Sequence, residues 1–232
     1  MYKRQGTSTY WQKALAKIMQ ERTGGFSVHS PFTHVNMATT DDEDDLFAEL
    51  SQAFPICNQY SAEFYVVHPN GILDFAPNES YEEELRKRAI ERLLKFDFLC
   101  AQNGIQMVIE NLGFRQGCRP LFDQSSFLQI FHQYPHLRCL VDTGHATLGG
   151  YDIATLQQKL GSKILGYHLH DNNGFVDQHM RIGTGVIDWA LFGENFAKYT
   201  PDANVVLEYN SCTESEILED FTFLETICQS KT

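Results

Sequence analysis

Six short apolar segments of this chain each end in, or next to, a side chain that could bind a metal ion. These side chains are His29, His68, Glu110, Asp142, His168 and Glu208. A single such residue at a strand end is more often a satisfied core group, because buried ionisable side chains are costly unless they are paired or coordinated. Six of them in phase, separated by 39, 42, 32, 26 and 40 residues, favour one shared metal site.

Three more candidate ligands lie close to these positions in the sequence. In the segment DTGHA, His145 follows Asp142 by three residues, so both side chains could face one ion or two adjacent ions. In DQH, Asp177 and His179 are separated by one residue and would project to the same side of an extended segment. Imidazole and carboxylate ligands without thiolate favour Zn²⁺, Mn²⁺ or a related divalent ion, and the set is too rich in nitrogen for calcium.

His170 lies two residues after His168 and would share its face of a strand. Two roles are open for this side chain. It is a candidate substrate-binding residue, or it holds a neighbouring metal ligand through a hydrogen bond.

The segments that carry the candidate ligands have the composition of strands, and helical stretches separate them. The strand-like segments are FSVHSPF, EFYVVHPNG, IQMVIENLG, RCLVDTGHA, ILGYHLHD and NVVLEYN. Between them, residues 81–104 show apolar side chains at spacings of three and four, and residues 7–24 form a further helical segment. Strand alternating with helix predicts an α/β fold with a parallel sheet.

We therefore expect a (β/α)8 TIM barrel in which about six of the eight units are present and the first strands are missing. In this fold the carboxyl ends of the strands converge on one face, where active sites lie. Two acidic positions have a simpler interpretation, because residues 41–45 (DDEDD) and Asp188 are predicted to begin helices.

Composition indicates a single domain over residues 1–232, with 43% hydrophobic and 21% charged residues. No apolar run approaches the roughly 20 residues that a membrane span requires, so no membrane partner is expected. The six cysteines form no Cys-x-x-Cys pair, which favours reduced thiols and a cytoplasmic location. Residues 1–5 (MYKRQ) match the translated end of a sequencing-library transposon, so we expect them to be non-native.

The strand-end motifs are similar to those of the xylose isomerase-like TIM-barrel superfamily, which holds sugar phosphate isomerases and epimerases together with endonuclease IV. The matching segments are SVHSPF, VVHPNG, VIENLG, LVDTGHA, HLHDNNG with DQH and GTGVIDW, and VVLEYN. They occur in the family's order over residues 26–225. The resemblance therefore covers most of the chain, although it is less specific for the reaction than for the superfamily.

The two branches of this superfamily imply different uses of the same residues. Resemblance to the epimerases implies one ion on Glu110, Asp142, His168 and Glu208, with Glu110 and Glu208 exchanging a substrate proton. Resemblance to endonuclease IV implies three zinc ions and abasic-site cleavage. Its ligands would be all nine positions, namely His29, His68, Glu110, Asp142, His145, His168, Asp177, His179 and Glu208.

The phrases HDNNG and GTGVIDW resemble the isomerase branch more closely, and 18 Lys and Arg against 30 Asp and Glu provide no basic stripe for DNA. We expect a divalent-metal-dependent isomerase or epimerase of a sugar or sugar phosphate, binding one to three ions and acting through a metal-stabilised enediolate. The alternative is a zinc-dependent abasic-site endonuclease, for which alone nucleic acid would be a partner. A metal-binding barrel without catalytic activity is a lesser alternative.

Overall fold

A six-stranded parallel sheet forms the centre of the protein. The computed structural model describes residues 9–31, 35–70, 78–113 and 120–228. Its strands are β1 (Ser27–His29), β2 (Phe64–Val67), β3 (Met107–Glu110), β4 (Cys139–Asp142), β5 (Ile164–Leu169) and β6 (Asn204–Leu207). Every neighbouring pair is parallel, and the spatial order β1-β2-β3-β4-β5-β6 follows the chain. The predicted α/β fold with six parallel barrel strands is confirmed, each strand within the segment expected for it.

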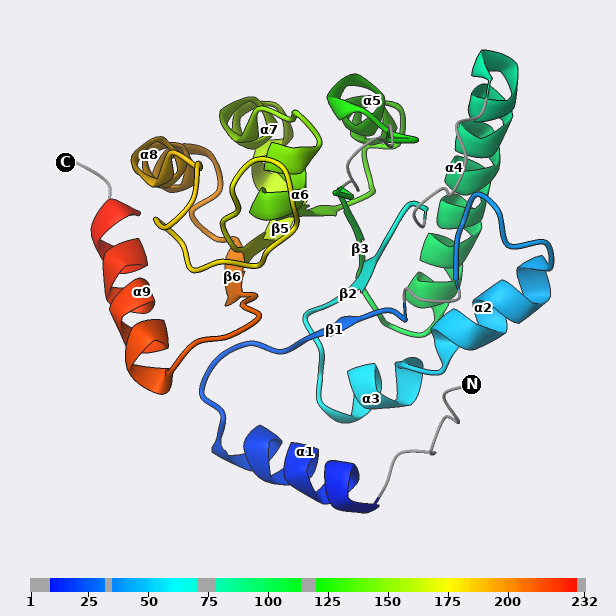
Figure 1. Cartoon of the computed structure of the whole chain (residues 1–232). Coiled ribbons are helices and arrows are strands. Elements are labelled where there is room, and N and C mark those ends of the chain that lie inside the picture. The colour runs from blue at the N-terminus through cyan, green and yellow to red at the C-terminus, as the bar shows by residue number, and fades with distance from the viewer. Residues whose placement is uncertain (1–8, 32–34, 71–77, 114–119, 229–232) are drawn as a thin grey trace.

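Helices surround the curved sheet on its outer side, as Figure 1 shows most plainly for α4, α5, α7, α8 and α9. The helices are α1 (Thr9–Glu21), α2 (Glu43–Ser51), α3 (Phe54–Gln59), α4 (Glu79–Gln102), α5 (Gln124–Gln133), α6 (Thr143–Leu148), α7 (Ile153–Leu160), α8 (Trp189–Tyr199) and α9 (Glu214–Ile227). The two predicted acidic helix starts are confirmed, because Asp42 caps α2 and Asp188 caps α8 through their side chains. None of the helices in the described ranges combines the length and the apolar character needed to cross a membrane.

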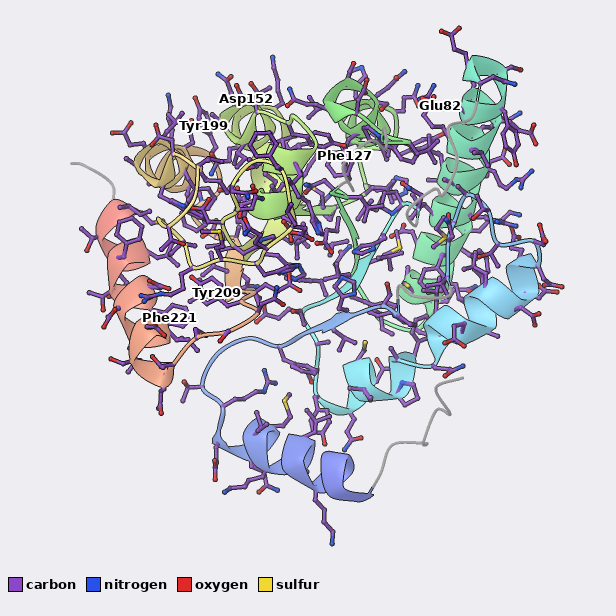
Figure 2. All side chains as sticks on the ribbon, in the orientation of Figure 1. Glu82, Phe127, Asp152, Tyr199, Tyr209 and Phe221 are labelled. Carbon is purple, nitrogen blue, oxygen red and sulfur yellow. The ribbon has the colours of Figure 1, made fainter. Side chains whose placement is uncertain are left out.

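The two-residue period of the strands divides their side chains between two environments. Outward-facing residues such as Tyr65, Ile109 and Tyr167 are fully buried in the main core between sheet and helices. Figure 2 shows side chains filling this layer, among them the labelled Phe127 of α5, which is also fully buried. The helices therefore cover the outer face of the sheet with a continuous apolar layer.

The inner face carries a smaller apolar layer beneath the strand ends. Its members are Phe64, Val66, Val108 and Leu140, with Leu165 packed against them. Gly166 belongs to this level, since a β-carbon at this position would lie 2.7 Å from the ring of Phe64. Two residues further along the same strands come the candidate ligands, so strand geometry sets polar side chains directly above an apolar floor.

Candidate metal centre

The carboxylate of Glu110, the last residue of β3, lies at the middle of the strand ends. Its Oε2 is 3.1 Å from His29 Nε2 and 3.2 Å from His68 Nε2. Its Oε1 is 3.2 Å from His168 Nδ1 and 3.5 Å from His145 Nδ1. The side chain is only 1% exposed. Imidazoles from three strand ends and one helix therefore converge on a single buried carboxylate.

Asp142 ends β4 and begins α6, so its position is fixed from several directions. Its Oδ1 accepts the backbone N–H of His145 at 2.7 Å as the helix cap. The Asn111 side chain accepts from the Asp142 N–H at 2.9 Å and donates to the Asp142 carbonyl at 3.0 Å. Asn111 was not among the predicted site residues. Its place directly after Glu110 was the one sequence signal, and that place does not show which hydrogen bonds the amide makes.

Glu208 follows β6 and shares the imidazole of His168 with Glu110. Its Oε2 is 3.3 Å from His168 Nδ1, on which Oε1 of Glu110 also lies at 3.2 Å. One N–H cannot serve both carboxylates fully, so this group has more acceptors than donors. The two carboxylates differ in access, because the Glu208 side chain is 41% exposed whereas that of Glu110 is buried. Glu208 is therefore the carboxylate that a small molecule entering the centre would meet.

The loop after β5 brings Asp177 and His179 to the same cluster. Oδ2 of Asp177 lies 3.4 Å from His145 Nε2 and 3.3 Å from His179 Nε2. His179 has a left-handed backbone conformation (φ 47°), and its Nδ1 donates to the Glu208 carbonyl at 3.0 Å. A non-glycine residue in this region indicates a backbone held by its surroundings. The structure thus brings all nine predicted ligands together.

Several contacts hold this loop against the rest of the molecule. Asp171 and Met180 exchange two backbone hydrogen bonds of 2.9 Å in an antiparallel bridge. The Asp171 carboxylate accepts the indole N–H of Trp189 at 2.8 Å, and Arg181 donates twice to Asp220 of α9 at 2.8 and 3.0 Å. The loop is therefore anchored on both sides of the residues that it contributes.

His170 is fully buried next to Asp142 and His179. Its Nε2 lies 3.0 Å from Oδ1 and 3.1 Å from Oδ2 of Asp142, to which it donates. Its ring stacks on that of His179, with centroids 4.0 Å apart and planes 14° from parallel. On the other side, a β-carbon on Gly144 would lie 2.0 to 2.7 Å from the His170 ring, so the glycine makes room for it. His170 thus makes a hydrogen bond to the candidate ligand Asp142, and the two roles expected for it stay predictions.

The charges of the cluster shift the protonation of its members. Burial opposes the charged form of His168, but the charge of Glu110, its hydrogen bond and the charge of Glu208 raise the pKa of His168 to about 9. The hydrogen bond with Asp177 outweighs burial and raises the pKa of His179 to about 9. Against its own burial, the charges of His168 and His68 hold the pKa of Glu110 well below its usual value. Protons on imidazoles thus balance the carboxylates, and divalent cations could replace those protons.

The donor atoms are spaced so that they could hold metal ions in several overlapping groups. Within each group, the ligand atoms lie within 4.8 Å of one another. The groups are His145 with His170, Asp177 and His179; His29 with Glu110 and His168; Glu110 with Asp142 and His145; and Asp142 with His168 and Glu208. These nitrogen and oxygen donors without thiolate fit Zn²⁺ or Mn²⁺.

Comparisons with known proteins agree with the fold described above. A family model described as "Xylose isomerase-like TIM barrel" matches residues 3–227. An uncharacterised protein of Methanocaldococcus jannaschii is 26% identical over 204 residues, which are 84% of this chain and 69% of that protein. The solved structure of a D-tagatose 3-epimerase-like protein superimposes with a TM-score of 0.79 at 23% identity, over 95% of this chain and 83% of the other.

Two further solved structures represent a zinc-bound protein and a nuclease. The IolI protein with a bound zinc atom matches with a TM-score of 0.75 at 17% identity, over 96% of this chain and 83% of that one. Endonuclease IV from Thermus thermophilus matches with a TM-score of 0.63 at 21% identity, over 96% and 82% of the two chains. At these identities the structural likeness concerns the fold.

Proposed function

Because the chain belongs to the xylose isomerase-like TIM-barrel family, we propose that it is a divalent-metal-dependent isomerase or epimerase of a sugar or sugar phosphate. The observation that carries this proposal is the pair of carboxylates around His168. Glu110 and Glu208 approach the same imidazole nitrogen at 3.2 and 3.3 Å from different strands. Isomerisation or epimerisation requires one group that removes a substrate proton and one that returns a proton. Two carboxylates beside the same candidate ligand, His168, could provide both.

Glu110, Asp142, His168 and Glu208 would hold the ion nearest to the substrate. When bound, a divalent ion supplies a Lewis acid that stabilises negative charge on the neighbouring oxygens of an open-chain sugar. The exposed carboxylate of Glu208 would take the proton from the carbon beside the carbonyl. Glu110, which approaches the same His168 nitrogen, would return a proton to the other face of that carbon or to the neighbouring carbon. The apolar layer below these residues excludes water from the base of the centre.

The other predicted ligands would extend this centre to two or three ions. His29 and His68 both face Oε2 of Glu110, at 3.1 and 3.2 Å. His145 and His179 both face Oδ2 of Asp177, at 3.4 and 3.3 Å. Zn²⁺ and Mn²⁺ fit these donors best.

Convergence of all nine ligand positions favours a second candidate function, a zinc-dependent endonuclease acting at abasic sites. One observation weighs against it. Arg181 is the basic residue of the ligand-bearing loop, and Asp220, Glu219 and Glu216 all pair with it. Its charge is therefore compensated inside the protein rather than offered to a phosphodiester. The isomerase or epimerase remains our proposal.

Uptake of deuterium from the solvent into the sugar distinguishes the isomerase or epimerase from the nuclease. The purified protein, loaded with Zn²⁺ or Mn²⁺, would be incubated in D₂O with ketopentoses, ketohexoses and their phosphates. We expect the NMR spectrum of the sugar to show deuterium at the carbon beside the carbonyl. It should also show the isomer or epimer formed as the product. A parallel reaction with a duplex containing a synthetic abasic site tests the nuclease. Nicking without deuterium uptake would overturn the proposal in favour of the nuclease, and neither reaction by a metal-loaded protein would favour a non-catalytic barrel.

A further inference from the structure

Two buried polar atoms of the cluster face each other without a hydrogen bond. They are His170 Nδ1 and Asp177 Oδ1, neither of which has a hydrogen-bond partner among the described residues. The distance between them is 3.9 Å, too long for a hydrogen bond. Buried polar atoms are normally satisfied, because leaving one unpaired costs about 1–3 kcal/mol.

The hydrogen bond on the other side of the His170 ring determines what kind of atom Nδ1 is. The Asp142 carboxylate can only accept, so Nε2 of His170 must carry the proton that bonds to it at 3.0 Å. In the neutral imidazole this leaves a lone pair on Nδ1. Two acceptors, a nitrogen lone pair and a carboxylate oxygen, then face each other in a buried space. A cation between them would satisfy both.

The surroundings of Asp177 provide the remaining donors for such a cation. His145 Nε2 and His179 Nε2 lie 3.4 and 3.3 Å from its second oxygen, Oδ2. The stacked rings of His170 and His179 thus present one nitrogen to each oxygen of this carboxylate. Ligand atoms of all four residues lie within 4.8 Å of one another.

We propose that His170 is the fourth protein ligand of a metal ion held by His145, Asp177 and His179, and that this site is closed and structural. A metal-binding histidine usually donates its other ring N–H to a carboxylate, a backbone carbonyl or water, and His170 donates to the Asp142 carboxylate. A site with four protein ligands keeps no position for substrate, whereas catalytic zinc sites keep one open. The ion would fasten the loop at 171–185 to α6, and the chemistry would stay with Glu110 and Glu208.

This inference relies on the proposed function only in placing a metal ion on Asp177, and its test does not require turnover. The measurement is zinc per chain in the full-length protein, by elemental analysis after dialysis against a weak chelator. His170→Asn is compared with His179→Asn, which removes a predicted ligand, and with His132→Asn on the outer helix α5 as the matched control. For His170→Asn and His179→Asn we expect about one equivalent less zinc per chain than in the wild type and the control.

Substitution by Co²⁺ provides a second readout, and its wild-type spectrum tests the closed site without any variant. A closed four-ligand site gives the wild-type protein an intense tetrahedral visible absorption, which His170→Asn should lose. Wild-type zinc content and cobalt spectrum in His170→Asn would overturn the proposal, as would a wild-type protein without the tetrahedral absorption. The two tests are independent. Deuterium uptake would still support the isomerase if the closed zinc site were absent, and the zinc and cobalt measurements would still support the closed site if the isomerase assay failed.

Discussion

Replacing Gly144 by alanine tests whether the His170 ring is held as tightly as the structure indicates. The new β-carbon would lie 2.0, 2.3 and 2.7 Å from three atoms of that ring. The ring cannot retreat freely, because it stacks on His179 and donates to Asp142. Overpacking of this kind costs about 1–3 kcal/mol. Loss of the hydrogen bond to an ionised acceptor adds about 1.5–3 kcal/mol.

Together these terms predict that Gly144→Ala lowers the free energy of unfolding by about 2.5–6 kcal/mol. With a urea dependence of about 2–3 kcal/mol per molar, the unfolding midpoint should fall by about 1–3 M. The assay is urea unfolding of the metal-free protein followed by circular dichroism. Repeating it with excess zinc should show a smaller zinc-induced stabilisation than in the wild type, since the displaced ring disturbs the nearby ligands.

Gly24→Ala is the matched control, because a β-carbon at Gly24 would meet no atom within 4 Å. This variant should stay within about 0.5 kcal/mol of the wild type. If Gly144→Ala and Gly24→Ala had the same midpoint, the His170 ring would have to be mobile. The close packing argued for this part of the centre would then be wrong.

Three further changes test other parts of the structure. Glu208→Gln should abolish turnover of a confirmed sugar substrate while the circular dichroism spectrum stays unchanged, because the half-exposed carboxylate carries the proton. The metal-free protein should lose stability as pH rises from about 6.5 through about 9. The folded protein holds protons on His168 and His179 up to about pH 9, and this stabilisation is lost as these groups deprotonate. The thermal unfolding midpoint measured across this pH range tests the prediction. Trp189→Phe should lower the free energy of unfolding by about 1.5–3 kcal/mol in urea, because it removes a hydrogen bond to the buried Asp171 carboxylate.

Each of these has a result that would contradict it. Unchanged turnover in Glu208→Gln would remove that residue from proton transfer. A thermal midpoint that rises steadily toward pH 9 would mean that the histidines are neutral in the folded metal-free protein. An unfolding midpoint of Trp189→Phe equal to that of the wild type would show that water replaces the indole N–H at Asp171.

The strand positions and the ligand cluster could be predicted from the sequence because both depend on short-range regularity. Each strand is a short β-branched or aromatic run, and a candidate ligand comes at its carboxyl end. Parallel strands then bring these ends together whatever the helices between them do. Glu110 and Asp142 illustrate this, since they are 32 residues apart in the chain and lie on adjacent strands.

The contacts that distinguish otherwise similar residues could not be predicted in this way. Asn111 acts through two hydrogen bonds to the backbone of Asp142 on the next strand, and nothing local marks it as different from any amide after a strand. His170 lies two residues after His168, a spacing that predicts the same direction for both side chains, yet the ring of His170 packs against Asp142 and Gly144. Such preferences depend on which atoms of distant segments fill the remaining space. Sequence periodicity carries no information about that.

The strand order described above has a consequence for how the molecule assembles. Because order in the sheet equals order in the chain, each strand can dock on its predecessor, and the scaffold can grow through mostly local steps. The candidate metal centre has the opposite property, since His29 and Glu208 belong to it from positions 179 residues apart. Its set of donors is complete only when the last strand has joined the first five. If the centre binds a metal ion as proposed, an ion that arrives during folding would meet only part of the candidate donors.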